Sequence, residues 1–124
     1  MPNMAKDKAG NLHLVYGIGD SIMYTYSSDK GQSFSSRLVI AVLPKLFSFA
    51  TRRPQISATN KGVVVIACAS TGNIYSHYKD NAGWKQGTRV NDVDTIVKEG
   101  LMALSADGEK CFCCMAGFKR KQEK

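Results

Sequence analysis

The chain has 124 residues, 44% of them hydrophobic, and carries a formal net charge of +7. This apolar content excludes an intrinsically disordered chain, and the length suffices for the core of one ordinary domain or part of one. No stretch approaches the roughly 18 apolar residues of a membrane span, and Met1 to Gly10 lacks the apolar core of a signal peptide. The sequence predicts no targeting or membrane segment, and it leaves the compartment open.

Much of the positive charge lies at the end of the chain, in Lys119, Arg120, Lys121 and Lys124. No basic helix or basic-aromatic motif accompanies this charge, so we expect a solvated surface and no nucleic-acid partner. Three of the four cysteines lie within residues 111–114, too close together for a metal-finger spacing or an evident disulfide framework. We therefore predict no metal and no other cofactor.

One sequence pattern occurs twice and begins a third time, with a period of about 50 residues. The first copy consists of Pro2, Met4, Ala5, Gly10, Asn11 and the apolar run 12–16. The second consists of Pro54, Ile56, Ala58, Gly62 and the run 63–68. The third begins with Gly100, Leu101, Met102 and Ala103 and reaches Gly108. A repeated unit that cannot bury its own faces needs neighbours, so this period predicts a propeller or another repeat array.

The apolar runs are short and rich in branched and aromatic residues, which predicts strands, and clusters of Gly, Asn and Asp between them predict tight hairpins. We therefore expect an all-β fold, a partial β-propeller of four-stranded antiparallel blades. The expected strands are residues 2–6, 11–17, 21–28 and 34–41 in the first repeat and 54–59, 63–69, 73–79 and 84–91 in the second. The two blades span about residues 2–42 and 54–91, followed by a partial third blade at about 100–116 and a basic tail at 117–124.

Two longer connections, residues 43–53 and 92–99, join the last strand of one repeat to the first strand of the next. In a propeller such crossovers lie on the face that usually carries the site, because long loops on a rigid scaffold concentrate function. We therefore expect the site near them. Leu46, Phe47 and Phe49 make the first crossover apolar, which favours packing over the blade junction above contact with a ligand.

A turn in the first repeat has the pattern Ser, any, Asp, any, Gly, any, any, aromatic. Its residues are Ser27, Asp29, Gly31 and Phe34. An Asp side chain can accept backbone N–H bonds across such a turn, Gly can take a positive φ, and the aromatic ring can pin the hairpin onto its blade. We expect these residues to be structural.

The second repeat holds a copy of this turn that is one residue short: Asp80, Asn81, Gly83 and Trp84. With the segments 53–56, 89–92 and 99–101, these turns resemble the Asp-box repeats of sialidase-like bacterial neuraminidases, over nearly the whole chain to residue 110. The resemblance implies a six-bladed propeller that hydrolyses a terminal sialic acid or a related glycan. It also implies that the Asp box is structural.

The resemblance also supplies two candidate site residues. Family sialidases hold the substrate carboxylate with arginines, one of them shortly before a Pro, because a guanidinium grips a carboxylate at two points. Arg52 stands in that place as a candidate substrate-binding residue, and a solvated surface charge is the alternative. The family places a Glu just before an inner strand, where it activates a tyrosine nucleophile. Glu99 stands there as the candidate catalytic residue.

Other chemically reactive side chains are expected to have ordinary roles. The tyrosines lie in repeating strands, where an aromatic side chain usually packs, so none is assigned as the partner of Glu99. Asp94 is a single carboxylate on a polar loop, which is usually solvated. His13 and His77 occupy strand positions that do not converge on other ligands, so we expect both to face solvent or neighbouring strands.

The third copy departs from the family pattern after Gly108. One permitted choice of codons for residues 111–120, displaced by one nucleotide, encodes Val, Phe, Val, Val, Trp, Leu, Asp, Leu, Arg, which resembles the strand that the family has here. We therefore hypothesise a reading-frame shift, which sequencing the gene tests. The alternative is an ordinary buried strand followed by a solvated tail.

The sequence thus predicts a fragment of a sialidase-like glycoside hydrolase without a complete active site. One alternative is a non-catalytic Asp-box propeller module that binds carbohydrate or protein, because a fold does not determine a function. Another is the product of a decayed gene, with no function of its own. The expected partner is a glycan or sialoside, and an uncovered blade edge is expected to favour self-association.

Overall fold

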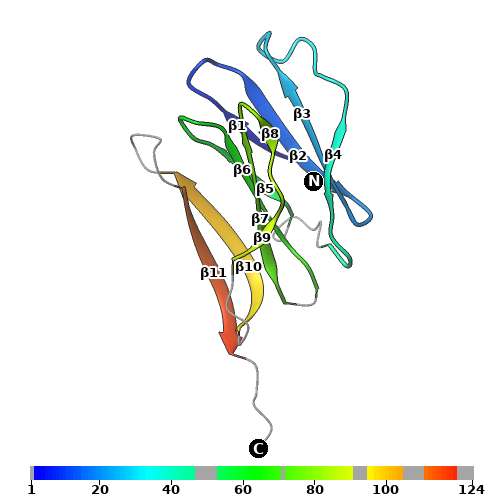
Figure 1. Ribbon diagram of the computed structural model, residues 1–124, viewed down its shortest axis with the longest axis vertical. Helices are drawn as coiled ribbons and strands as arrows, with labels where there is room; N and C mark the ends of the chain where they lie inside the picture. The colour runs from blue at the N-terminus through cyan, green and yellow to red at the C-terminus, as the bar shows by residue number, and fades with distance from the viewer. Residues whose placement is uncertain (1, 47–52, 71, 91–94, 105–110, 120–124) are drawn as a thin grey trace, which may run out of the picture.

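The structure is a computed structural model that describes residues 2–46, 53–70, 72–90, 95–104 and 111–119. The secondary-structure elements among these residues are all β-strands, with no helix, and every strand pair is antiparallel. The predicted all-β fold is confirmed for this part of the chain. Figure 1 shows three successive layers, which follow the chain from the N-terminus to the C-terminus.

The first layer is a four-stranded sheet in the order β1-β2-β3-β4. Its strands are β1 (Asn3–Lys6), β2 (Leu12–Ile18), β3 (Ser21–Ser27) and β4 (Leu38–Val42). The hairpin between β2 and β3 is tight, with Gly19 at a φ of 57°. The expected meander is therefore present, although β4 begins later than predicted because the preceding turn extends to Ser35, whose N–H donates to the Tyr26 carbonyl.

The second layer contains β5 (Gln55–Ala58), β6 (Val63–Cys68), β7 (Ile74–Asp80), β8 (Gly83–Trp84) and β9 (Thr88–Arg89). Both β8 and β9 pair with β7, so two short strands occupy the place of the single strand predicted at 84–91. Between these two strands the chain passes close to His77. A Cβ at Gly87 would lie 2.4 Å from the His77 ring, which shows how tightly the chain crosses that side chain between β8 and β9.

The third layer is the hairpin of β10 (Thr95–Leu104) and β11 (Cys111–Lys119). It differs from the prediction at both ends. Residues 95–99 belong to β10 instead of the crossover, and β11 continues into the expected basic tail, because the ladder extends to the pair Thr95 and Lys119. The hairpin contacts the second sheet through β5 and β6.

Each sheet of the stack has two distinct faces, which we name by direction along the chain. The forward face of the first sheet carries Val15, Ile22 and Tyr24 and packs against the second sheet. The rear face of the second sheet meets it with Ile56, Val65, Ala67 and Ala69, which belong to the same buried cluster. Between the inner strands, the Ile56 N–H donates to Asn3 Oδ1 over 2.9 Å.

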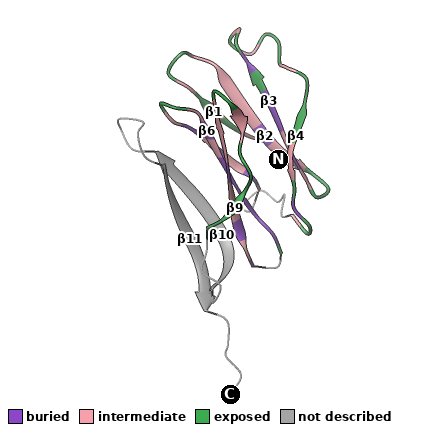
Figure 2. Ribbon diagram, viewed as in Figure 1, coloured by how far each residue is buried: buried purple, intermediate pink, exposed green. Residues whose placement is uncertain are grey.

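The two sheets are buried to different extents, as Figure 2 shows. In β6, Val65 on the rear face and Ile66 on the forward face are both buried, because the first sheet covers one side and β10 contacts the other. This explains the unbroken apolar run 63–68, which is typical of a strand covered on both faces. In β2 the residues on the rear face are only half-buried or exposed.

Both crossovers lie partly outside the described residues, Phe47 and Phe49 included. The beginning of the first crossover is described. Leu46 packs against the buried cluster and forms an isolated bridge with Ala69 of the second repeat. The Ser70 N–H also donates to the Lys45 carbonyl over 2.8 Å. At Leu46, the predicted packing over the junction of the two repeats is confirmed.

His77 supplies a testable pH dependence of the fold. The residue is buried, and its Nε2 has no hydrogen-bond partner among the residues that the structure describes. Burial lowers the pKa of His77 below its usual value of 6.5, so this side chain binds a proton more readily in the unfolded chain than in the folded one. The free energy of unfolding is therefore highest above about pH 6.5 and decreases as the pH falls below that value, because there the unfolded state binds more protons.

We expect the free energy of unfolding, measured with urea, to decrease between about pH 7.5 and 5.5. His77→Leu should show a weaker dependence over this interval, because it removes the titrating group from the rear face of the second sheet. The same slope in both proteins would show that His77 is not responsible.

Candidate ligand-binding cleft

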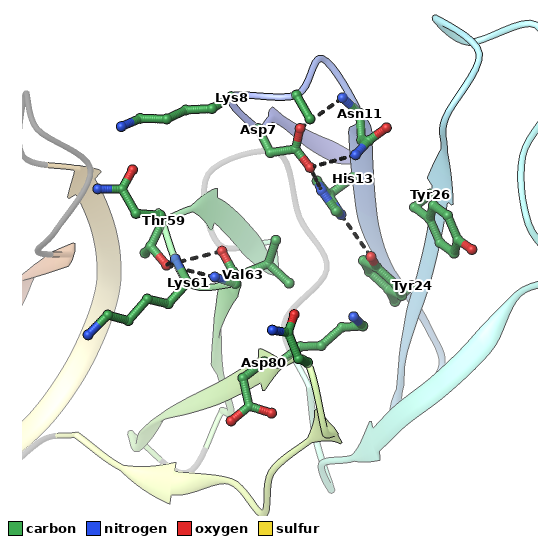
Figure 3. A pocket seen from close by; sticks show the side chains of 15 residues that line it. Asp7, Lys8, Asn11, His13, Tyr24, Tyr26, Thr59, Lys61, Val63 and Asp80 are labelled. Carbon is green, nitrogen blue, oxygen red and sulfur yellow. Dashed lines mark hydrogen bonds and ion pairs between the residues drawn. The ribbon is translucent and has the colours of Figure 1, made fainter.

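A cleft with a volume of about 490 Å³ opens between the first and second sheets (Figure 3). Three turns contribute to its lining, at residues 7–11, 59–62 and 79–81. They are the β1–β2 and β5–β6 hairpins and the start of the β7–β8 hairpin. Because the strands alternate in direction, the crossover that begins after β4 lies at the opposite end of the sheets. The cleft is therefore not where the crossovers led us to expect a site.

Three rings from the forward face of the first sheet line one wall of the cleft. His13 on β2 stacks with Tyr24 and Tyr26 on β3, at centroid distances of 6.0 and 6.5 Å, and the two tyrosine rings are 6.3 Å apart. The cross-strand pairing of His13 with Tyr26 places these two side chains opposite each other. Tyr24 is buried, whereas Tyr26 is 44% exposed, so Tyr26 is the ring that a ligand can reach.

A chain of hydrogen bonds runs along this wall from the β1–β2 turn into the core. Asp7 Oδ2 lies 2.9 Å from His13 Nε2, and His13 Nδ1 lies 2.8 Å from the Tyr24 hydroxyl. An ionised carboxylate can only accept, so Nε2 carries a proton, and a neutral ring then accepts the Tyr24 proton at Nδ1. Asp7 also accepts from the backbone and side-chain N–H groups of Asn11, which close the turn.

The protonation states of the groups in this series of hydrogen bonds suit a structural role. Burial raises the pKa of Tyr24 to about 12, and the negative charges of Tyr26 and Asp7 add to this effect. Burial acts to raise the pKa of Asp7, but the hydrogen bonds from His13 and Asn11 outweigh it and lower the pKa below its usual value. Tyr24 therefore stays a neutral hydroxyl and Asp7 a carboxylate near neutral pH, and neither is a ready nucleophile or proton donor.

The rim of the cleft is positively charged. Lys8, Lys61 and Lys79 line it, and none of them has an ion pair within the described part of the chain. The acidic groups of the lining are already engaged. Asp7 bonds to His13, and Asp80 lies 3.6 Å from Lys85. In Figure 3 the side chains of Lys8 and Lys61 extend from neighbouring turns toward the same side of the cleft.

The first Asp box forms a turn of the kind predicted from the sequence. Asp29 Oδ1 accepts the Ser33 N–H at 2.9 Å and the Ser27 hydroxyl at 2.7 Å, and the Gly31 N–H donates to Ser27 Oγ at 2.9 Å. Gly31 has a φ of 91°. The hydrogen bonds from Ser33, followed by that from Ser27, lower the pKa of Asp29 to about 2. The ring of Phe34 is 45% exposed, so among the described residues it does not hold the hairpin against its sheet as predicted.

The second Asp box keeps part of this geometry. Asp80 Oδ1 accepts the Ala82 N–H at 2.8 Å, and Gly83 has a φ of 113°. Trp84 packs against the buried cluster and meets the Tyr24 ring edge-on, at a centroid distance of 5.0 Å. The aromatic residue of this shorter turn therefore joins the two sheets and stands next to the cleft wall.

The two candidate residues of a hydrolase site are not tested by the described part of the structure. Arg52 lies outside the described residues. Glu99 lies on β10, opposite Ala116 and directly after a register shift at Val97. Such irregularities recur near active sites. Asp94 is also outside the described residues, so the assignments of Arg52 and Glu99 remain predictions.

The sequence analysis missed the convergence of Asp7, His13 and Tyr24. His13 does face a neighbouring strand, as expected, but its contact with Asp7 depends on the β1–β2 turn folding back over β2. A usable signal was the spacing of Asp7 and Asn11 around Gly10, because Asp and Asn side chains commonly close such turns. The lysines of the second repeat carried no such signal.

Comparisons with known proteins leave the chain without an assigned family, since neither a family model nor a curated protein matches it. Among the described residues, no three His, Cys, Asp or Glu side chains are grouped so that they could hold a metal ion. In the same part of the chain, no helix is long and apolar enough to span a membrane. The cleft is thus assigned from its geometry alone.

Proposed function

We propose that the chain is a segment of a sialidase-like Asp-box propeller and that it binds an acidic glycan in the cleft between its two sheets without cleaving it. This proposal combines the family resemblance with the non-catalytic alternative that the sequence left open. The observation that carries it is the lining of the cleft, with an accessible aromatic ring, three lysines and carboxylates that already have partners.

The stacking of the repeats supports the propeller. The rear face of the second sheet packs on the forward face of the first, and β10 contacts the second sheet next. Successive repeats therefore meet through opposite faces, so the arrangement can continue from one repeat to the next, as it does in propellers and solenoids. Two sheets packed through equivalent faces would instead end the series.

The lining of the cleft supports binding above hydrolysis. Glycoside hydrolysis requires a group that protonates the leaving oxygen. Asp7 remains ionised because of its hydrogen bonds, Tyr24 is buried, and Asp80 is paired with Lys85. Sugar-binding sites need less: a ring surface for the apolar side of the sugar and a few well-placed polar groups. Tyr26 and the rim of the cleft supply both.

The charge of the rim supports an acidic ligand such as a sialoside. Lys8 and Lys61 come from two separate turns and Lys79 from the end of β7, and the nearby carboxylates already have partners. A sugar carboxylate would gain from this positive field, whereas a neutral sugar would not. The lysines are solvated, so each contributes modestly, and the preference depends on their combination.

The test is an NMR titration of the full chain with 3′-sialyllactose and with lactose, which differ by the acidic sugar. We expect sialyllactose to bind at least about tenfold more tightly than lactose, which is a difference in binding free energy of about 1.4 kcal/mol. Its binding should also shift the resonances of Tyr26 and His13. Lys61→Glu should weaken this preference. The matched control is Lys45→Glu, which makes the same charge change at an exposed position on the crossover after β4 and should preserve it.

Turnover of a fluorogenic sialoside separates the proposal from the hydrolase prediction. We expect no hydrolysis by this chain. Hydrolysis that Glu99→Gln abolishes would overturn the proposal in favour of a sialidase activity. Equal binding of lactose and sialyllactose would retain a glycan-binding module but reject its preference for acidic sugars, and binding of neither would reject the cleft as a glycan site.

A further inference from the structure

Two lysines of the cleft lie on corresponding turns of the two repeats. The β1–β2 and β5–β6 turns each follow the first strand of their repeat, and both line the cleft. Lys8 lies two residues before Gly10 in the first turn, and Lys61 directly precedes Gly62 in the second. The two sheets pack against each other, and packed sheets lie about 10 Å apart. Each repeat therefore contributes one lysine to successive points along the rim.

Neither lysine side chain is needed to close its turn. Asp7 Oδ1 accepts the Asn11 N–H at 2.9 Å in the first turn, and Thr59 Oγ1 accepts the Gly62 N–H at 3.1 Å in the second. Both lysines are exposed, and in Figure 3 their side chains extend to the same side of the cleft. The local structure of both turns thus leaves the ammonium groups available to a ligand.

Lys79 adds a third ammonium group from a different element. It lies near the end of β7, where it pairs with the buried Val63, and it is itself half-buried. Neighbouring Asp80 lies 3.6 Å from Lys85 and accepts a backbone N–H. None of the three lysines of the cleft has an ion pair within the part of the chain that the structure describes. An ammonium acts as a point charge, so the single carboxylate of one sugar does not satisfy three of them on three elements.

The polar groups that a ligand can reach lie on the rim of the cleft and not at its bottom. Of the buried lining residues, Tyr24 bonds to His13 and Val63 has no polar side-chain atom. A pocket for one terminal sugar encloses its ligand and buries most of its surface. Accessible groups along an open rim instead suit a chain that enters at one end of the cleft and leaves at the other. The exposed lining residues with polar side chains include Lys8, Tyr26, Lys61 and Asn81.

Given the proposed glycan binding, we infer that the cleft holds an internal segment of an acidic polysaccharide, with a carboxylate on each of several neighbouring sugars. Lys8, Lys61 and Lys79 pair with successive carboxylates, and one sugar packs on the exposed ring of Tyr26. A single solvated ion pair contributes little, so affinity arises from several such pairs on one ligand chain. A glycan with one carboxylate uses only part of the rim.

Calorimetric titration of the full chain compares the linear tetramer of sialic acid with 3′-sialyllactose, which carries a single carboxylate. We expect the tetramer to bind about tenfold more tightly, since a repeated single contact would give at most about a fourfold statistical gain. Its affinity should also decrease more steeply with salt, because more ion pairs are screened. If sialyllactose binds and the tetramer gains no more than the statistical factor, the result overturns the polysaccharide inference and retains the proposed acidic-glycan binding. Binding of neither overturns both.

Three single variants test whether the tetramer lies along this rim. Lys8→Gln, Lys61→Gln and Lys79→Gln should each weaken its binding about two- to fivefold, as expected for the loss of one solvated ion pair. The matched control is Lys121→Gln, which removes the same charge from the basic tail of the sequence and should leave the affinity unchanged. Loss of affinity in the control equal to that of the cleft variants, or no loss in the cleft variants, overturns the inference. Circular dichroism checks that all four variants keep their strand content.

An oligothymidylate of equal charge tests whether negative charge alone is recognised. Single-stranded nucleic acid binds by stacking successive bases on several aromatic side chains, and Tyr26 is the only exposed ring among the described residues that line the cleft. We therefore expect the oligonucleotide to bind more weakly than the sialic acid tetramer. Equal or tighter binding of the oligonucleotide would assign the rim to polyanions in general and overturn the polysaccharide inference.

Discussion

Gly62→Ala is expected to destabilise the fold by about 3 kcal/mol or more, which would be among the largest effects of any single methyl group in this chain. A Cβ at Gly62 would lie 1.8 Å from the carbonyl oxygen of Lys79 and 2.9 Å from its carbonyl carbon. Both atoms belong to the backbone of β7, which cannot move aside like a flexible side chain. The added methyl group must therefore separate β6 from β7 at the edge of the cleft.

The measurement is the free energy of unfolding in urea, and Gly10→Ala provides the matched control. Gly10 occupies the corresponding turn of the first repeat at a φ of 90°, with no atom within 4 Å of an added Cβ. Its replacement should cost only the strain of a positive φ, about 1 kcal/mol. Equal losses in the two variants would mean that the close approach of Gly62 to β7 does not limit stability.

Trp84→Ala is expected to lower the free energy of unfolding by about 3 kcal/mol, because it removes the ring that joins the two sheets. Trp84 packs against the buried cluster and contacts Tyr24 edge-on. Its loss leaves a gap beside the wall formed by His13 and Tyr24, so it should also weaken glycan binding in the cleft. Thermal unfolding and the sialyllactose titration measure the two effects separately.

Phe34→Ala is the control for this prediction, since Phe34 is the aromatic residue of the other Asp box. Its ring is 45% exposed on the rear face, so truncation should cost less than about 1 kcal/mol in the isolated chain. If Phe34→Ala destabilised the chain as much as Trp84→Ala, the ring of Phe34 would contribute as much to stability as the packed ring of Trp84, which its exposure does not predict.

Much of the fold follows from local sequence patterns. Short apolar runs separated by Gly, Asn and Asp predict β2, β3, β6 and β7 within one or two residues of their ends. The Ser27 and Asp29 pattern also predicts the hydrogen bonds of its turn. These features depend on neighbours within a few residues, so the sequence contains the information that forms them.

The extent of the third layer was less predictable. Residues 95–99 were predicted as part of a crossover, but they extend β10 because β11 offers a matching ladder as far as Lys119. The single strand expected at 84–91 divides into β8 and β9 where the chain crosses His77. In β10 the pairing with the partner strand overrides local preference.

The sequence by itself determined that this chain is a series of antiparallel strands joined by tight turns of Ser, Asp, Asn and Gly, because strand period and turn chemistry are local. Only the tertiary structure decided which faces are covered and where the cleft lies. Asp7, His13 and Tyr24 meet because one turn folds over two strands, and Lys8 and Lys61 line one cleft because two repeats stack. Such contacts depend on register and on the packing of one sheet against another, which no single segment specifies.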